Sequence, residues 1–181
     1  MISLDPEKVA EATHSNKANV LANWPIILTE LHKFEPISED FLIAVAATVA
    51  VETAWQFAPI HEFGNKSYFD KRYENRHDLG NVHVGDGYKY HGRGFIQITG
   101  RYNYTHFGKV LGLDLVENPD IALEPVSSAK ILAQYCIEHD INVLAKKRNW
   151  YKVRKAINGG LNGYEAFTHC VKELGGEIKI T

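Results

Sequence analysis

Apolar residues recur at helical spacing through the first third of the chain. A helix is expected to begin at Asp5-Pro6, because proline is tolerated at the first position of a helix. Apolar residues three and four apart predict a second helix: Val20, Trp24, Ile27, Leu28 and Leu31. The segment Ser38-Glu39-Asp40 precedes a third helix, which we expect to continue to about Phe57.

The pattern changes between Pro59 and Tyr104, where polar residues, glycine and tyrosine are scattered without a helical period. This segment is predicted to be rich in loops, with a short hairpin. Helical patterns return over residues 103–111, from Pro125 onward, and over 149–157 and 163–174. We therefore predict a mostly α fold in a single domain, residues 1–181. It should form two helical lobes around a cleft made by about 50–105 and 155–165.

Composition and charge narrow the class of function. A formal net charge of −2 argues against a general electrostatic attraction to nucleic acid. The most apolar run, residues 41–51, is too short to span a bilayer and is expected to be a buried helix. The N-terminus lacks the apolar segment of a signal peptide, so we expect synthesis in the cytoplasm without membrane insertion. Cys136 and Cys170 allow at most one disulfide and are interpreted as buried thiols.

Glu52 is the first candidate for catalysis. Phe41, Val45 and Val49 recur every four residues, and Glu52 continues their apolar face of the third helix. A carboxyl group there is either paired or partly desolvated. Desolvation favours the neutral form and raises the pKa, which can make a carboxylic acid a proton donor near neutral pH. The alternative is a glutamate at the helix end that turns to water or pairs with a lysine.

Two further carboxylates, Glu62 and Glu74, lie in the loop-rich segment. Hydrolysis of a glycosidic bond uses two carboxyl groups, one as proton donor and one as the anion that activates water or attacks the sugar. A donor on a rigid helix and a base on a facing loop would fit this chemistry. Glutamates in loops are also common without any catalytic role.

The segment 88-YKYHGRGFIQITGRYNY-104 is dense in aromatic and hydrogen-bonding side chains. Its tyrosines have flat faces and hydroxyl groups that suit sugar rings: Tyr88, Tyr90, Tyr102 and Tyr104. Its other donors and acceptors are Arg93, Gln97, Thr99 and Asn103. Gly92 and Gly94 permit close backbone approach or unusual dihedral angles. The alternative interpretation is a hairpin whose tyrosines pack over the core.

Motifs for other chemistries are missing from the sequence. The run GDGYKYHGRG matches neither phosphate-binding glycine pattern, and no HExxH, calcium-loop or GxSxG motif occurs. Four of the nine histidines lie in the loop-rich segment, where solvated or hydrogen-bonded imidazole is the better interpretation: His61, His77, His83 and His91. We therefore expect neither a metal nor a cofactor.

Several ordered blocks within residues 40–165 together resemble glycoside hydrolase family 19. They are 51-VET-53, 79-LGN-81, 85-GDG-87, 90-YHGRGFIQITGRYNY-104, 118-NPDIALEP-125 and 157-INGGLNG-163. The chain resembles bacteriophage endolysins and bacterial lysozyme-like members more than plant chitinases. The resemblance implies a mostly α, bilobal, lysozyme-like fold. It also implies cleavage of β-1,4 links in polymers containing N-acetylglucosamine, by inversion, with two glutamates and no metal.

The resemblance also implies roles for individual residues. Glu52 corresponds to the general acid. Glu62 matches the short acid-to-base spacing of bacterial members and is the favoured base, with Glu74, at the longer plant spacing, as its rival. Thr99 stands where the family has a Ser or Thr that helps to hold the attacking water. Positions implied to bind sugar, or to line or brace the cleft, are Tyr90, Arg93, Gln97, Asn103 and Asn158.

The chain departs from the family pattern after the acid, where many relatives have a Gly-Gly pair and this chain reads Glu52-Thr53-Ala54-Trp55-Gln56-Phe57. Trp55 is expected to narrow that end of the cleft or to pack under the loop. We expect a monomeric, endolysin- or muramidase-like hydrolase that cuts peptidoglycan glycan strands and acts on the cell wall after release. Chitin or its oligomers are the alternative substrate. A wall-binding protein or virion tail component without turnover is a second alternative.

Overall fold

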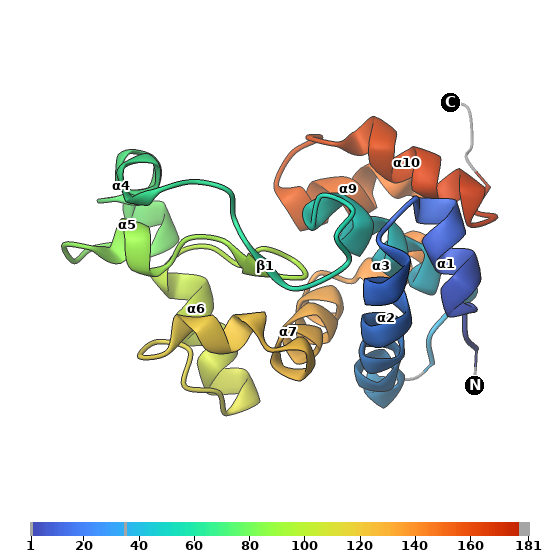
Figure 1. Cartoon of the computed structure of the whole chain (residues 1–181), viewed down its shortest axis with the longest axis horizontal. Helices are drawn as coiled ribbons and strands as arrows, with labels where there is room; N and C mark the ends of the chain where they lie inside the picture. The colour runs from blue at the N-terminus through green and yellow to red at the C-terminus, as the bar shows by residue number, and fades with distance from the viewer. Residues whose placement is uncertain (1, 35, 178–181) are drawn as a thin grey trace. The chain divides into compact units, whose positions relative to one another are not determined.

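The computed structural model describes residues 2–34 and 36–177, and the chain divides into two compact units. Unit 1 comprises residues 1–58 and 132–181, and unit 2 comprises residues 59–131. The boundary at Ile131 falls inside α7 (Pro125–Glu138). Helices dominate both units, which confirms the predicted mostly α class (Figure 1). The predicted cleft stays a prediction.

Unit 1 is built around a helix that is buried on every side. In α3 (Glu39–Glu52), all residues from Phe41 to Ala50 are buried, as the apolar run predicted. This helix contacts α1, α8, α9 and α10, so no face of it is left to solvent. Its neighbours α1 and α10 appear beside it in Figure 1. The elements of unit 1 besides α3 and the end of α7 are α1 (Pro6–Thr13), α2 (Lys17–Leu31), η1 (His32–Phe34), α8 (Ile141–Lys146), α9 (Trp150–Asn158) and α10 (Tyr164–Glu173).

Helix α3 ends at Glu52, and the prediction that it continues to Phe57 is wrong. The backbone N–H groups of Ala54 and Trp55 donate back to carbonyls of the last turn, at 3.2 and 2.7 Å. These are the paired hydrogen bonds of a Schellman motif, which stops a helix with a residue in the left-handed region. Ala54 is that residue, with φ of 48°. Apolar residues continue past the stop, which is why the sequence suggested a longer helix.

Polar side chains hold the segment that follows α3 in a fixed conformation. The Thr53 hydroxyl accepts the N–H of Phe57 at 2.9 Å. The side-chain amides of Asn19 and Asn23 donate to the carbonyls of Gln56 and Phe57, at 2.7 and 2.9 Å. Left-handed backbone at non-glycine residues persists only where surrounding contacts fix it, and these hydrogen bonds supply them.

Unit 2 contains more helix than the sequence indicated. Three short helices lie in the segment predicted to be mostly loop, and the elements of the unit besides its part of α7 are β1 (Ile60–His61), α4 (Lys66–Tyr73), η2 (His77–Leu79), α5 (Asp86–Lys89), β2 (Arg93–Gly94), α6 (Arg101–Leu111) and η3 (Pro119–Leu123). Helix α4 begins where the Asn65 side chain accepts the N–H of Tyr68 at 2.9 Å. Only Phe69 and Tyr73 of α4 are buried, so its apolar period was too short to detect.

The small sheet of unit 2 joins residues far apart in the sequence. β1 pairs antiparallel with β2, with Ile60 opposite Gly94 and His61 opposite Arg93. The predicted hairpin corresponds to the turn after β2, where Arg93 and Ile98 exchange backbone hydrogen bonds at 3.3 and 3.1 Å. Gly94 is needed there, because its φ is 90° and a Cβ would lie 2.8 Å from Ser128 Oγ.

Candidate active site

Glu52 forms an ion pair with Arg154 of α9, within unit 1. Arg154 Nη1 lies 2.6 Å from Glu52 Oε1, and the two side chains are 2% and 13% exposed. The same guanidinium donates from Nε and Nη2 to the carbonyl of Asn162, at 2.8 and 2.5 Å. Of the alternatives that the sequence left open, Glu52 is paired and largely buried, and its partner is a buried arginine rather than a lysine.

Helix α9 carries this arginine in an apolar stripe. Its buried residues are Trp150, Val153, Arg154 and Ile157. This spacing places all four on one face of the helix. Asn158 lies one turn beyond Arg154, so the helix presents both on the same side. The chain passes close by at Gly163, where a Cβ would lie 3.2 Å from Arg154 Nη2.

Trp55 follows Glu52 on the left-handed segment and is 45% exposed. This exposure excludes a position underneath the loop, which was one of the two expectations for Trp55. The N–H of Asn16 donates to the Trp55 carbonyl at 2.9 Å, so the backbone at this position is held from the start of α2. The indole therefore stands on fixed backbone with nearly half of its surface open to solvent.

Glu62 directly follows β1 and is held within unit 2 by both its main chain and its side chain. Its N–H donates to the carbonyl of Gly92 at 2.8 Å. Its two carboxylate oxygens lie 2.8 and 2.9 Å from the Tyr73 hydroxyl, and Oε2 also accepts the Gly92 N–H at 3.3 Å. Arg72 Nε in turn donates to the Tyr73 oxygen at 3.0 Å. This carboxylate is anchored and surrounded by hydrogen-bond donors.

Glu62 also lines an open pocket of about 650 Å³ within unit 2. The walls combine charged groups with flat rings and include Lys66, Phe69, Tyr88 and His91. Sugars have apolar ring faces and polar edges, so this mixture of aromatic and hydrogen-bonding groups suits a carbohydrate. The volume lies in the range of small-molecule sites.

Two histidines at this pocket are hydrogen-bonded to each other. His91 Nδ1 lies 2.6 Å from the Tyr88 carbonyl, which can only accept, so Nδ1 carries the proton. Nε2 of neutral His91 then accepts from His61 Nδ1 at 3.0 Å. Burial lowers the pKa of His91 to about 4. Partial desolvation and the charge of Arg93 lower the pKa of His61 as well. Both imidazoles are therefore neutral at neutral pH.

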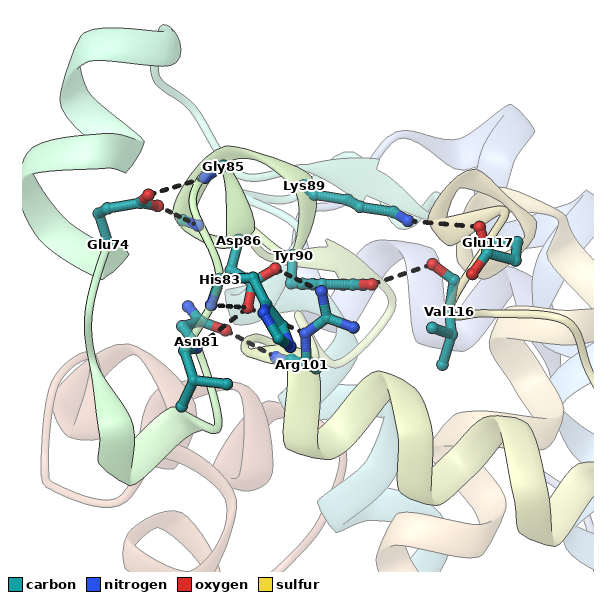
Figure 2. A network of polar contacts seen from close by, with 12 residues as sticks. Glu74, Asn81, His83, Gly85, Asp86, Lys89, Tyr90, Arg101, Val116 and Glu117 are labelled. Carbon is teal, nitrogen blue, oxygen red and sulfur yellow. Dashed lines mark hydrogen bonds and ion pairs between the residues drawn. The ribbon is translucent and has the colours of Figure 1, made fainter.

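The carboxylate of Glu74, the rival base, binds backbone N–H groups (Figure 2). Its oxygens accept the N–H groups of Gly85 and Gly87, at 2.7 and 2.8 Å. A Cβ on Gly87 would lie 2.9 Å from Glu74 Oε2, so the approach requires glycine. Since Gly85 and Gly87 flank the start of α5, the carboxylate satisfies N–H groups that have no partner within that helix. The contacts of Glu74 are those of an anchoring residue.

Asp86 holds the same loop from the other side (Figure 2). Arg101 binds it with two hydrogen bonds, at 2.9 and 2.6 Å, and the N–H groups of Val82 and His83 donate to it at 3.0 Å. Burial alone would raise the pKa of Asp86, but Arg101 and the backbone donors outweigh it, so the pKa is lowered. The predicted GDG block is thus a braced turn that presents its amides to Glu74.

Three of the predicted polar residues follow one another from the β2 turn into α6. Gln97 Nε2 donates to the carbonyls of Ile60 and Gly94, at 2.8 and 2.9 Å, and so ties the two strands together. The Thr99 hydroxyl donates to the Gln97 carbonyl at 3.0 Å, and Asn103 Nδ2 donates to the Thr99 carbonyl at 2.9 Å. All three side chains are half-buried.

The side chains of Glu62 and Gln97 both lie close to the Cα of Gly92. A Cβ on Gly92 would lie 3.0 Å from Gln97 Oε1 and 3.2 Å from Glu62 Oε2, so the absent side chain leaves room for both. The close backbone approach expected at Gly92 is therefore confirmed.

Tyr90 and Arg93 brace the interior of unit 2. Tyr90 is fully buried, and its hydroxyl donates to the Val116 carbonyl at 3.0 Å (Figure 2). Arg93 is 6% exposed, pairs with Asp120 at 2.8 Å and donates to the Tyr104 hydroxyl at 3.1 Å. These contacts fit the bracing role, and Tyr90 and Tyr104 pack in the core as the alternative interpretation held.

Comparison with known protein families identifies the family of this chain. A family model described as chitinase class I, of glycoside hydrolase family 19, matches residues 38–142. The chain belongs to glycoside hydrolase family 19. The matched range includes Glu52 and Glu62 and ends before Arg154.

Two curated relatives match parts of this family 19 chain. A family 19 domain-containing protein of Haemophilus influenzae is 45% identical over 95 residues, which cover 51% of the chain and 44% of that protein. A basic endochitinase of Vitis vinifera is 56% identical over 45 residues, 24% of the chain and 14% of that protein. The chain thus spans less than half the length of these relatives. The expected closeness to bacteriophage endolysins stays a prediction.

Solved structures share the fold. Chitinase C from Streptomyces griseus superimposes with a TM-score of 0.71 at 20% identity, covering 98% of the chain and 78% of that structure. A bacterial family 19 chitinase gives a TM-score of 0.70 at 19% identity, covering 98% and 97%. This likeness confirms the predicted family fold.

Sequence reasoning missed three residues that hold the candidate carboxylates. Arg154 could have been found, because a charged residue in an apolar stripe predicts a buried ion pair. Tyr73 and Arg72 gave no such signal, since a polar eight-residue helix shows too little periodicity. Among the described residues of this family 19 chain, no group of three His, Cys, Asp or Glu side chains is placed to hold a metal ion. None of its described helices is long and apolar enough to cross a membrane.

Proposed function

We propose that the chain is an inverting glycoside hydrolase that cleaves β-1,4 links in glycans containing N-acetylglucosamine. Glu52 acts as general acid and Glu62 as general base. The observation that carries this proposal is the difference between the two candidate bases. Glu62 lines an open pocket with room for a sugar, whereas both oxygens of Glu74 bind backbone N–H groups. Family membership supports the class of reaction.

The reaction follows from these roles. Glu52 gives its proton to the glycosidic oxygen while the bond from that oxygen to the anomeric carbon breaks. A water molecule attacks the anomeric carbon from the opposite face, and Glu62 takes a proton from this water. The leaving sugar departs with a hydroxyl group, and the product carries the inverted configuration. Thr99 helps to hold the attacking water, as the family resemblance implies.

The proton on Glu52 has a defined place. Arg154 binds Oε1, so we infer that the transferable proton sits on Oε2. When Glu52 is protonated, the hydrogen bond from Arg154 to Oε1 is no longer an ion pair and is weaker. Arg154 stays in position because it also donates twice to the Asn162 carbonyl.

The substrate proposed first is the glycan strand of peptidoglycan, on the sequence resemblance to lysozyme-like members. Chitin is the second candidate, because the plant relative is named as an endochitinase and the structural neighbours are named as chitinases. Both polymers present the same β-1,4 link and N-acetyl groups, so the two-carboxylate mechanism applies to either.

The test is digestion of purified peptidoglycan sacculi and of chitin hexamer side by side, with product masses, reducing ends and the first-formed anomer determined. The variants Glu52→Gln, Glu62→Gln and Glu74→Gln are measured in parallel, and circular dichroism confirms that each is folded. Muropeptides of inverted anomer, absent with Glu52→Gln and Glu62→Gln, support the first substrate. Short chitin oligomers with intact sacculi move the substrate to chitin.

Two results would overturn the proposal. If neither polymer is cut by the folded chain but either is bound, the chain is a glycan-binding protein without turnover. If Glu62→Gln retains turnover and Glu74→Gln loses it, Glu74 is the base. With the proposed roles, kcat/KM should fall at alkaline pH, where the acid loses its proton, and at acid pH, where the base gains one.

A further inference from the structure

We propose that Tyr73 is a positioning residue for the general base: it orients the Glu62 carboxylate and stabilises its charge. It does so within a chain of hydrogen bonds from Arg72 to Tyr73 to Glu62, here called the relay. The inference rests on the proposed role of Glu62. It adds a function for Arg72 and Tyr73 of α4, which lie outside the sequence blocks that carry the family resemblance.

The direction of the relay follows from the donors. Arg72 Nε can only donate, so the Tyr73 oxygen, 3.0 Å away, accepts from it. The single proton of the hydroxyl is then free for Glu62, whose oxygens lie 2.8 and 2.9 Å away. A hydroxyl that accepts from a cation becomes a stronger donor, because hydrogen bonds in a chain polarise one another. The positive charge of Arg72 therefore strengthens the hydrogen bond that the neutral Tyr73 hydroxyl donates to Glu62.

Packing fixes the ring that carries this hydroxyl. Tyr73 is 8% exposed and stacks on Phe69 with ring planes 13° apart. The Arg72 guanidinium lies 5.5 Å from the Tyr73 ring. Burial, and then the hydrogen bond to Glu62, raise the pKa of Tyr73 to about 12. The hydroxyl therefore keeps its proton throughout the pH range in which a glycosidase is assayed.

The relay would serve a base in two ways. The hydrogen bond that Tyr73 donates to the Glu62 carboxylate is charge-assisted, so it partly compensates the negative charge at the edge of the pocket. A donor shared between both oxygens also fixes the rotation of the carboxylate and leaves lone pairs on its outer side for water. A direct guanidinium contact would bind the anion more strongly and leave a weaker base.

Helix α4 offers a matched control in Tyr68. Its ring also lies near Arg72, at 5.7 Å, and packs edge-on against Phe69, but it is 42% exposed. Tyr68→Phe and Tyr73→Phe each remove one hydroxyl from the same helix and keep the ring. Only Tyr73→Phe removes a donor to Glu62.

The experiment measures kcat and KM as functions of pH for wild type, Tyr73→Phe, Tyr68→Phe and Arg72→Met on the glycan that wild type cleaves. We expect Tyr73→Phe to lower kcat by about 10- to 100-fold with KM nearly unchanged, because the Glu62 carboxylate loses the donor that orients it. Arg72→Met should lower kcat by a smaller factor, because Arg72 contacts Glu62 only through Tyr73, and Tyr68→Phe should match wild type.

The outcomes separate the relay from the proposed function. If Glu62→Gln is inactive but the Tyr73→Phe profile superimposes on wild type, the relay is wrong and the base assignment stands. If Tyr73→Phe lowers only the melting temperature, Tyr73 is structural and the relay is wrong. If Glu62→Gln is fully active, Glu62 is not the base and both proposals fall.

Discussion

Glu52 and Glu62 are held in place by opposite means. Glu52 ends a helix that is buried on every side, and its carboxylate meets a guanidinium that is 2% exposed. Glu62 follows a two-residue strand, lines an open pocket, and meets the neutral hydroxyl of Tyr73. Glu52 therefore contacts a cation directly, whereas Glu62 lies at an open pocket and is linked to the cation Arg72 only through the Tyr73 hydroxyl.

The difference matches what an acid and a base require. A proton donor must keep its geometry while its charge changes, and Arg154 allows this because it has the Asn162 carbonyl as a second acceptor. A base must keep its negative charge and remain accessible to water. The Tyr73 hydroxyl supports the charge of Glu62 without covering it.

The largest effect is expected for Arg154→Met. Removing one partner of a buried ion pair leaves an uncompensated charge and costs about 3–5 kcal/mol of unfolding free energy. Urea unfolding followed by tryptophan fluorescence measures this within unit 1, because the three tryptophans are Trp24, Trp55 and Trp150. Adding Glu52→Gln to Arg154→Met should recover part of the loss.

Arg148→Met is the matched control for that measurement. Arg148 pairs with Asp40 and Glu177 but is 34% exposed, so its loss should cost about 1 kcal/mol or less. If the two variants lose the same unfolding free energy, burial does not make the Glu52–Arg154 pair more important for stability than an exposed pair.

A smaller and pH-dependent effect is expected in unit 2. Burial lowers the pKa of His91 to about 4, below the unfolded value of 6.5. The unfolded chain therefore binds the proton first, and stability present above pH 6.5 is lost as pH falls toward 4. The loss can reach about 3 kcal/mol. Hydrogen exchange should show amides of unit 2 opening between pH 6.5 and 4, while tryptophan emission changes less.

His91→Asn removes this titration, because an amide gains no proton in that range. The variant is expected to be less stable than wild type at pH 7, since the stacking on Phe69 is lost. Its exchange rates, corrected for intrinsic pH dependence, should then change less between pH 6.5 and 4 than those of wild type, with the remaining slope due to His61. A slope equal to that of wild type would assign the pH effect to other groups.

Glu74→Gln sharpens the contrast between the two candidate bases. A glutamine offers one oxygen and one NH₂ group where both backbone partners are donors, so one hydrogen bond becomes a repulsion. We expect a loss of about 1–3 kcal/mol in stability. Turnover per folded molecule should be retained. Glu62→Gln should show the reverse, with little change in the melting temperature and no turnover.

The sequence predicted those parts of the fold that depend on local patterns. The helices of unit 1 have apolar periods long enough to detect, and α3 was recognised as buried because its apolar run is continuous. Helix α4 was missed because only Phe69 and Tyr73 face inward. The end of α3 was placed too late, because a Schellman stop with Ala54 lacks the glycine that normally signals it.

The candidate site was predictable to the extent that it rests on single residues. Glu52 stood out from its helical face, and Glu62 and Glu74 from the chemistry that a second carboxylate would serve. The partners were not predictable, since Arg154 is far from Glu52 in the sequence and Tyr73 lies in a helix without a clear period. The choice between Glu62 and Glu74 needed their contacts, because spacing alone left both open.

The smallest effect concerns the turn that directly follows Glu52. Ala54 has a φ of 48°, which disfavours any residue with a Cβ, so Ala54→Gly should stabilise unit 1 by about 0.5–1 kcal/mol. Ala46→Gly in the middle of α3 is the control and should destabilise by at least a similar amount. If Ala54→Gly raises stability and leaves kcat unchanged, the strain is incidental to catalysis. If stability rises while kcat falls, the strained turn helps to position the Glu52 side chain. Glu52 would then be fixed by the backbone that follows it as well as by its ion pair with Arg154.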